Sequence, residues 1–330
     1  MKDTQYVALS ARIRAMEPHL ITLERLERLM EASDNQGVEK LLQEWGIPAF
    51  DVTNPTAMDQ TIAQMRGDTV EALSFGLPQM GLLDVFSVEY DYHNVKSLLK
   101  ARAMGQDATR MLSSLGRIAV ATLVAAVETG EYGDLPSGFA QAVAEATQVL
   151  DTTRDPQQGD MVLDRYYFAE LAELASTMGN QDLVRYVQLK IDAVNLRTLV
   201  RTVRMGKPPV FLAQALFAGG SVDSDVLVTI AQNGGAGLEE LYQASGLETA
   251  ANLGVAALKG GVMTGFEQAC DNAVSAYWDF TKLIPFGESV VLAYLAAKET
   301  EYLNLRIVLL GRGAGLPADV IASRLRTSCL

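Results

Sequence analysis

The sequence predicts an all-α protein composed of three related helical units, and three observations support this fold class. Apolar residues recur at the three- and four-residue spacing of helices, and no bounded run alternates apolar with polar residues as a strand does. Glycine-rich breaks separate these periodic segments. A 15-residue pattern also occurs three times along the 330-residue chain. The breaks lie at residues 130–138, 219–220, 233–237, 260–265 and 311–315.

The N-terminal region predicts two helices. Residues Tyr6 to Met16 form a first short helix, and a second begins at Pro18. Proline is well suited to the first position of a helix, because its missing N–H has no partner inside the helix there. The apolar side chains of this second helix recur at helical spacing, at Leu20, Leu23, Leu26, Leu29 and Met30.

The C-terminal region predicts one long helix and one short helix. The long helix covers Glu288 to Leu310, and we expect Gly311 and Gly313 to end it. Pro317 then begins a short helix with basic residues, including Arg326, in its last turn, where the helix dipole favours positive charge.

The most informative feature is the internal repeat. Residues 91–105, 192–206 and 301–315 share an acid and an asparagine three positions later. An aliphatic residue, a basic residue, one variable residue and two further aliphatic residues follow the asparagine. Each copy has a glycine 14 residues after the acid, and the copies are offset by 101 (192 − 91) and 109 (301 − 192) residues. We therefore predict three units with approximate threefold symmetry. Their boundaries are residues 1–112, 113–213 and 214–330.

The polar positions of the repeat are the candidate site residues. The acid and the asparagine are i,i+3 neighbours on one helix face, while the basic residue lies about 140° around the helix from the acid. Two interpretations remain open. The asparagines could bond buried helix ends while the charges form buried pairs between helices, which we expect, or the polar positions could form a common surface for a partner. The residues are Asp91, Asn94, Lys96, Asp192, Asn195, Arg197, Glu301, Asn304 and Arg306.

Composition excludes several classes of function. The chain has 40 acidic and 27 basic residues, a formal charge of −13, which argues against nucleic-acid binding and against a polybasic membrane anchor. The apolar fraction of 49% is high for such a charge, and a large partner interface would explain it. Cys270 and Cys329 have no metal-binding or redox spacing.

No targeting or spanning segment is evident. The first residues lack the apolar run of a secretory signal. The longest apolar run, Ile118 to Val127, has ten residues, whereas a spanning helix needs about 20. We therefore predict a cytoplasmic protein that does not cross a membrane.

The sequence predicts no catalytic, cofactor or metal site. A phosphate-binding loop requires Gly-Lys followed by Ser or Thr, but Gly206-Lys207 is followed by Pro208. The glycines at 311–315 follow a helix rather than the strand of a dinucleotide site. His93 has Glu89 one helical turn away, but a metal needs more ligands, and His19 is expected at the surface.

Several segments resemble one family, the C subunits of the archaeal and bacterial A/V-type ATPases, which are the counterparts of the d subunit of eukaryotic V-ATPases. Most of the similarity lies near the C-terminus, and an opening and a middle segment add to it. The segments are Tyr6–Arg14, Asp164–Phe168, Ile284–Ser289, Tyr294–Arg306 and Gly315–Leu325.

The resemblance implies a non-catalytic rotor adaptor. Members of this family are all-helical funnels of three similar subdomains that join the central shaft to the membrane proteolipid ring. They thereby couple ATP hydrolysis or synthesis to proton or sodium transport. The resemblance places the chain peripherally on the cytoplasmic face of a membrane complex. The third copy departs from the pattern at Gly311 and Gly313, so we expect its helix to end earlier or to kink. The alternative is an all-α scaffold or enzyme of an unrelated family.

Overall fold

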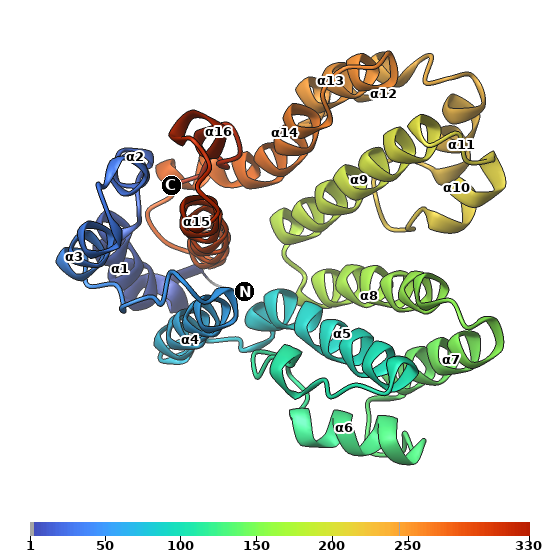
Figure 1. The fold of residues 1–330 in the computed structure, drawn as a ribbon, viewed down its shortest axis with the longest axis horizontal. Coiled ribbons are helices and arrows are strands. Elements are labelled where there is room, and N and C mark those ends of the chain that lie inside the picture. Colours follow the sequence, from blue (N-terminus) through green and yellow to red (C-terminus); the bar gives the residue numbers. More distant parts are fainter. Residues whose placement is uncertain (1–2, 244) are drawn as a thin grey trace. The chain divides into compact units, whose positions relative to one another are not determined.

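The computed structural model describes residues 3–243 and 245–330, and this part of the chain is entirely helical apart from its connections (Figure 1). Helices make up 74% of the structure, and no strand occurs in the described ranges. The predicted all-α class is confirmed.

The helices vary from single turns to α15, which has 26 residues. Four short 3-10 helices accompany them, η1 (Asp3–Tyr6), η2 (Glu17–His19), η3 (Thr109–Met111) and η4 (Tyr277–Leu283). The α-helices are α1 (Val7–Met16), α2 (Leu23–Glu31), α3 (Asn35–Glu44), α4 (Pro55–Ser74), α5 (Gly81–Met104), α6 (Val120–Thr129), α7 (Ser137–Thr153), α8 (Pro156–Met178), α9 (Gln181–Arg204), α10 (Pro209–Ala215), α11 (Ser224–Gln232), α12 (Leu238–Tyr242), α13 (Glu248–Leu258), α14 (Met263–Ala276), α15 (Glu288–Gly313) and α16 (Ala318–Ala322).

The chain divides into two compact units. Unit 1 contains Met1–Pro78, Leu199–Lys207 and Ile230–Leu330, and unit 2 contains Gln79–Thr198 and Pro208–Thr229.

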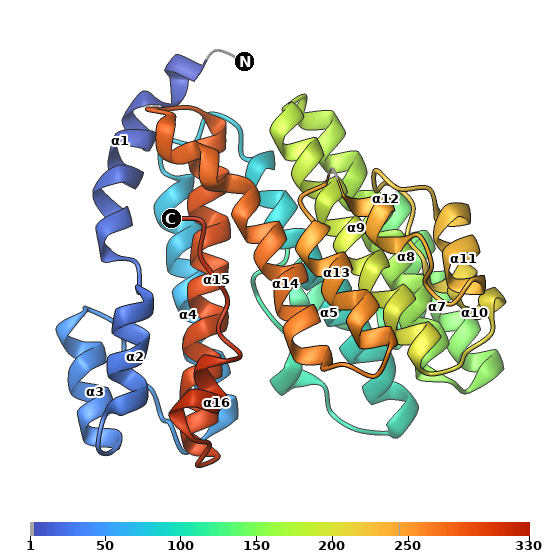
Figure 2. The same cartoon turned by 90° about the horizontal axis from the view of Figure 1, so that it is seen from above.

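The core of unit 1 joins helices from both ends of the chain. Helix α15 lies among α1, α2 and α4, and α16 packs on α2 and α15 (Figures 1 and 2). Residues from α2 to α4 thus share one hydrophobic core with residues of α15 and α16. Each Å² of apolar surface buried in such a core stabilises the fold by roughly 25 cal/mol. The buried members are Ile21, Leu26, Leu29, Met30, Val38, Leu42, Phe50, Met58, Ile62, Met65, Tyr302, Leu305, Val308, Leu309, Ile321 and Leu325.

Unit 2 is organised around α5. This helix packs against α6, α7 and α8, and α7 packs along α8. Aromatic side chains fill the space between them: the Tyr92 ring meets Phe139 and Tyr167 edge-on, with ring centroids 4.9 and 5.7 Å apart. Such edge-to-face contacts are the geometry that the ring quadrupoles favour.

The N-terminal helices begin close to their predicted positions, with one correction. Helix α1 matches the predicted first helix, but Pro18 lies in the single turn η2 and α2 begins only at Leu23. The Thr22 hydroxyl accepts a hydrogen bond from the Arg25 N–H at 3.3 Å and thereby caps α2. The cap therefore determines where α2 begins, whereas proline only begins the preceding turn.

The C-terminal helices correct two predictions. Helix α15 continues through Gly311 and ends at Gly313, 12 residues after its acid (313 − 301), the same offset at which α9 ends (204 − 192). It therefore does not end early. A Cβ at Gly311 would lie 2.7 Å from Cγ1 of Ile321, so this glycine allows α16 to pack closely. Helix α16 ends at Ala322, and Arg324 and Arg326 lie beyond it instead of in its last turn.

Candidate functional site

The repeated asparagines each hold a stretch of non-helical backbone. The Asn94 amide donates to the Ser113 carbonyl and accepts the Ser113 N–H, both at 2.8 Å. Asn195 makes the same pair with Phe217, at 2.8 and 2.9 Å. Asn304 makes it with Arg326, at 2.8 and 2.7 Å. Each buried amide forms hydrogen bonds with both the N–H and the C=O of one residue. It thereby fixes that residue against the helix that carries the asparagine.

Each repeated acid holds a residue that stands just before a helix. Asp91 accepts the Ile118 N–H at 3.1 Å, and Asp192 accepts the Val222 N–H at 3.2 Å. Glu301 accepts the Ile21 N–H at 2.8 Å. The three donors stand two residues before the first residues of α6, α11 and α2, respectively. We call each set, an acid and an asparagine with the backbone that they hold, a joint.

The joints are buried and differ in how the acid's second oxygen is satisfied. Asp91 is fully buried and accepts the Arg117 guanidinium at 2.8 Å. Asp192 instead accepts the Ser221 N–H at 3.0 Å and the Ser221 hydroxyl at 2.5 Å. Glu301 pairs with Lys298 on the same helix. A buried carboxylate is stable only with such donors, since desolvation of the charge is costly.

Arg117 gives the first joint an extended charge network. Its guanidinium also donates to Glu170 at 2.7 Å, and Glu170 accepts the Tyr92 hydroxyl at 2.8 Å. Burial raises the pKa of Asp91, while the Ile118 N–H and Arg117 oppose that shift. Burial also raises the pKa of Asp84, which the same guanidinium partly offsets.

Two glycines make room for the first two acids. A Cβ at Gly116 would lie closer than 3.0 Å to Oδ1 of Asp91, and one at Gly220 would lie equally close to Oδ1 of Asp192. Each glycine stands two residues before the backbone donor. A larger side chain there would push the acid away from the N–H groups it accepts, so these positions require glycine.

The repeated glycine after each helix has one backbone conformation in all three copies. Gly105, Gly206 and Gly315 have φ values of +63°, +64° and +68°. This left-handed conformation is accessible to glycine at little cost and reverses the chain after a helix. The sequence repeat therefore corresponds to a repeated local structure, while the division into three units remains a prediction.

The third joint uses chain segments from opposite ends of the sequence. In the first joint the asparagine and the acid hold Ser113 and Ile118, and a continuous chain joins these two residues. In the third, Asn304 holds Arg326 but Glu301 holds Ile21, which is 280 residues away from it in sequence.

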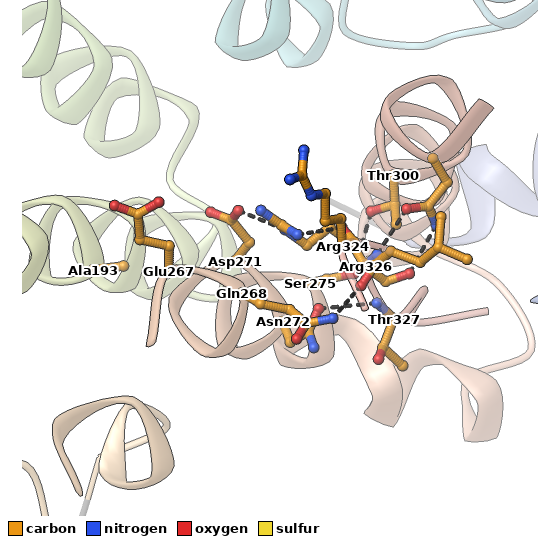
Figure 3. A network of polar contacts seen from close by, with 12 residues as sticks. Ala193, Glu267, Gln268, Asp271, Asn272, Ser275, Thr300, Arg324, Arg326 and Thr327 are labelled. Carbon is orange, nitrogen blue, oxygen red and sulfur yellow. Dashed lines mark hydrogen bonds and ion pairs between the residues drawn. The ribbon is translucent and has the colours of Figure 1, made fainter. Parts of the chain in front are cut away.

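The segment that Asn304 holds is anchored along α14 as well (Figure 3). Arg326 pairs with Asp271 at 2.7 Å, and the Thr327 N–H donates to Asn272 at 2.9 Å. Gln268 donates to the Leu325 carbonyl at 2.5 Å.

Labelling of Cys329 is expected to report whether this segment stays docked. The thiol is fully buried and donates to the Ala293 carbonyl, and burial raises its pKa to about 12. Both effects suppress the reactive thiolate. We expect Asn304→Ala to speed the reaction of Cys329 with a thiol reagent at pH 8 at least tenfold, with Cys270 as the internal reference. Equal acceleration of both thiols would indicate general unfolding instead.

The repeated basic positions are less buried than we expected. Lys96 pairs with Asp164 of α8 at 2.5 Å, and Arg306 pairs with Asp59 of α4 at 2.6 Å. The Arg306 and Asp59 side chains are 47% and 48% exposed, so this pair links two helices at the surface and is not a buried pair. The Arg197 guanidinium donates to the Ala193 carbonyl at 3.4 Å.

Replacement of Arg306 by alanine is therefore expected to have a small effect. A pair this exposed contributes about 0–1 kcal/mol to the free energy of unfolding, because water screens it. Urea denaturation of Arg306→Ala against the wild type measures this. A loss above about 2 kcal/mol would show that the pair is far stronger than its exposure implies.

Three features that sequence reasoning did not identify complete the joints: the two glycines, the second donors Arg117 and Ser221, and Ile21. A weak signal exists for the first two joints, since Gly-Arg-Ile at 116–118 and Gly-Ser-Val at 220–222 both precede a helix. The corresponding His-Leu-Ile at 19–21 lacks the glycine, so no motif links Ile21 to Glu301.

The remaining polar candidates are engaged in structural contacts. His93 bonds the Met111 carbonyl at 3.0 Å, and Glu89 lies 3.6 Å from the Lys190 ammonium. No group of three or more potential metal ligands occurs among the residues that the structure describes.

Gly206 and Lys207 are expected not to bind ATP. Their N–H groups donate to the Val203 and Thr202 carbonyls at the end of α9. Nucleotide phosphates need free N–H groups, typically at a helix N-terminus, and not the negative end of a helix dipole. Calorimetric titration of the isolated chain should show no ATP binding at micromolar concentrations. A micromolar dissociation constant that Lys207→Ala abolishes would contradict this.

The fold and the joints define a helical structural protein, in which buried charges hold the chain's own backbone. The chain matches the ATP synthase (C/AC39) subunit family over residues 9–324 and belongs to that family. This membership confirms the prediction of a non-catalytic subunit of V/A-type ATPases.

Named relatives cover most of the chain. It is 21% identical to the C subunit of the V-type sodium ATPase of Enterococcus hirae, over 98% of both chains. It is 25% identical to the C subunit of the A-type ATP synthase of Methanocaldococcus jannaschii, over 97% of this chain and 86% of that protein. It is 28% identical to the C subunit of the V-type ATP synthase of Thermus thermophilus, over 69% of this chain and 68% of the relative.

Proposed function

We propose that the chain is the central-rotor adaptor of its ATPase and links the central shaft to the membrane proteolipid ring. In this role it passes torque between them and couples ATP hydrolysis or synthesis to proton or sodium transport. Family membership supports the proposal, and the relatives' names include both a sodium ATPase and ATP synthases.

The observation that carries the proposal is the set of three joints. An adaptor under torque must resist bending where one helical segment continues into the next. The first two joints each hold such a connection, and the third holds the segment before α2 and the C-terminal segment. In every joint the asparagine makes two hydrogen bonds with backbone, and the acid accepts at least one. Hydrogen bonds to the charged acids contribute about 1.5–3 kcal/mol each and those with the neutral asparagines about 0.5–1.5 kcal/mol each, so opening a joint costs free energy.

The adaptor would lie at the cytoplasmic face of the membrane as a peripheral part of the complex. None of the helices described for residues 3–243 and 245–330 is both long and apolar enough to cross a bilayer. In this proposal the chain attaches to the ring through contacts with the proteolipid subunits. The three units predicted from the sequence, which contain α5, α9 and α15 respectively, remain part of this proposal.

Reconstitution tests this role directly. Purified shaft subunits are mixed with a detergent-solubilised proteolipid ring, with and without the chain, and the ring is recovered by affinity purification. We expect the shaft to be recovered with the ring only when the chain is present. Arg306→Ala serves as a control that should recover as much shaft as the wild type. Recovery of the shaft without the chain would contradict the proposal.

A further inference from the structure

We infer that the N-terminal residues 6–20 form a detachable strap that locks unit 1, and that its release weakens torque transfer; this last point rests on the proposed function. The strap contains α1 and η2 and runs along α15 (Figure 2). Its inner face is buried through Tyr6, Leu9 and Ile13. Four polar points attach it to α4, η4 and α15, and Arg25 of α2 also donates to the His19 and Leu20 carbonyls.

Two arginines of the strap cap the ends of other elements. Arg12 donates to the Ala72 and Phe75 carbonyls, at 2.6 and 2.8 Å, where α4 ends. Arg14 donates to the carbonyls of Thr281 and Ile284, both at 2.6 Å, where η4 ends. The last carbonyls of a helix have no partner within it, and these guanidinium groups donate to such carbonyls at the ends of α4 and η4. The Thr281 carbonyl also accepts the Ile284 N–H at 3.0 Å.

The other two points hold α15 itself. The Ser10 hydroxyl accepts the Gly287 N–H, at the start of α15, at 3.2 Å. The Ile21 N–H, directly after the strap, donates to Glu301 at 2.8 Å and so fixes the point where the strap meets the core. The strap thus spans the first half of α15 and links it to the end of α4.

The strap can separate from α15, whereas the segments held in the first two joints cannot separate from α5 and α9. In the first two joints, the residue held by the asparagine and the residue held by the acid are only a few positions apart in the chain. When the hydrogen bond to the acid breaks, the bond to the asparagine therefore still keeps the acid's donor nearby. Ile21 has no such tether to Asn304 or Glu301. The core cluster of unit 1 begins at Ile21 and joins α2, α3 and α4 directly to α15. The strap can therefore lift while that core stays intact.

Hydrogen exchange of the isolated full-length chain tests this. In Ser10→Ala/Glu301→Gln, two of the four polar points are weakened while side-chain size is nearly kept. We expect amides of residues 7–16 to exchange about 10- to 100-fold faster, while core amides of α4 and α15 stay within twofold of the wild type. Trypsin should also cleave after Arg12 or Arg14 correspondingly faster.

Asp192→Asn in the second joint is the matched control and should leave strap exchange unchanged. If strap and core amides accelerate together, the strap is one cooperative unit with the core, and the inference is wrong. If strap exchange does not change in the double variant, the inference is equally wrong.

A second measurement separates the inference from the proposed function. In the assembled ATPase, we expect the double variant to transport fewer ions for each ATP hydrolysed. If strap exchange accelerates but this ratio is unchanged, the strap does not control coupling. If removal of the whole chain leaves the ratio unchanged, the proposed adaptor role fails, whatever the exchange result.

Discussion

An ATPase complex assembled without this chain is expected to hydrolyse ATP but not to transport ions. The catalytic chemistry lies on other subunits, so the soluble motor keeps part of its activity. Without the adaptor, torque has no path to the proteolipid ring. ATP hydrolysis and ion uptake are measured in parallel in proteoliposomes, with and without the chain. We expect hydrolysis to persist and uptake to fall to background.

Adding back the purified chain is the control and should restore transport. Adding back Arg306→Ala should restore it equally, since that pair is exposed. Ion uptake at the normal rate in the absence of the chain would contradict the adaptor role.

Loss of the buried carboxylate in the second joint is expected to cause the largest single-residue destabilisation. Asp192 is 3% exposed and accepts three hydrogen bonds, from the Ser221 N–H, the Ser221 hydroxyl and the Val222 N–H. In Asp192→Ala these three donors lose their acceptor, although Ser221 is exposed and Val222 is only half-buried. A hydrogen bond to a charged group contributes about 1.5–3 kcal/mol, and water can replace the carboxylate only at the exposed Ser221. We therefore expect the free energy of unfolding to fall by about 3 kcal/mol.

Urea denaturation measures this change, with the midpoint and the slope reported separately. Asp192→Asn is the matched variant, because its amide oxygen can still accept an N–H, and it should lose markedly less stability. Gly220→Val should resemble Asp192→Ala, since its side chain would displace the carboxylate. A loss below about 1 kcal/mol in Asp192→Ala would show that the joint contributes little to stability.

The roles of the repeated residues were only partly predictable. The pattern identified Asn94, Asn195 and Asn304 as equivalent, and they form equivalent hydrogen bonds. Their partners are single residues in non-helical backbone, whereas the expected partners are helix ends. A buried amide can satisfy either, and only the path of the connecting chain decides which backbone comes within reach.

The burial of the repeated basic residues could not be predicted from the local sequence pattern. Spacing placed Lys96 and Arg306 at the same register of their helices, and we expected buried pairs. The Arg306 pair is about half exposed, whereas that of Lys96 is 23% and 35% exposed. Register on a helix determines the direction of a side chain, but exposure depends on which neighbouring helix covers that face.

The amino-acid order alone predicted the helical class, the positions of α1 and most of α15, and the family. It also predicted the glycines that follow α5, α9 and α15. Each of these depends on local spacing or on a motif that one segment carries. That α15 lies in the core of α2 to α4, and that Ile21 completes the third joint, became evident only from the packed chain. A buried acid needs a donor, but any free N–H that packing brings close will satisfy it. The choice of a donor 280 residues away therefore follows from the packing of both chain ends together.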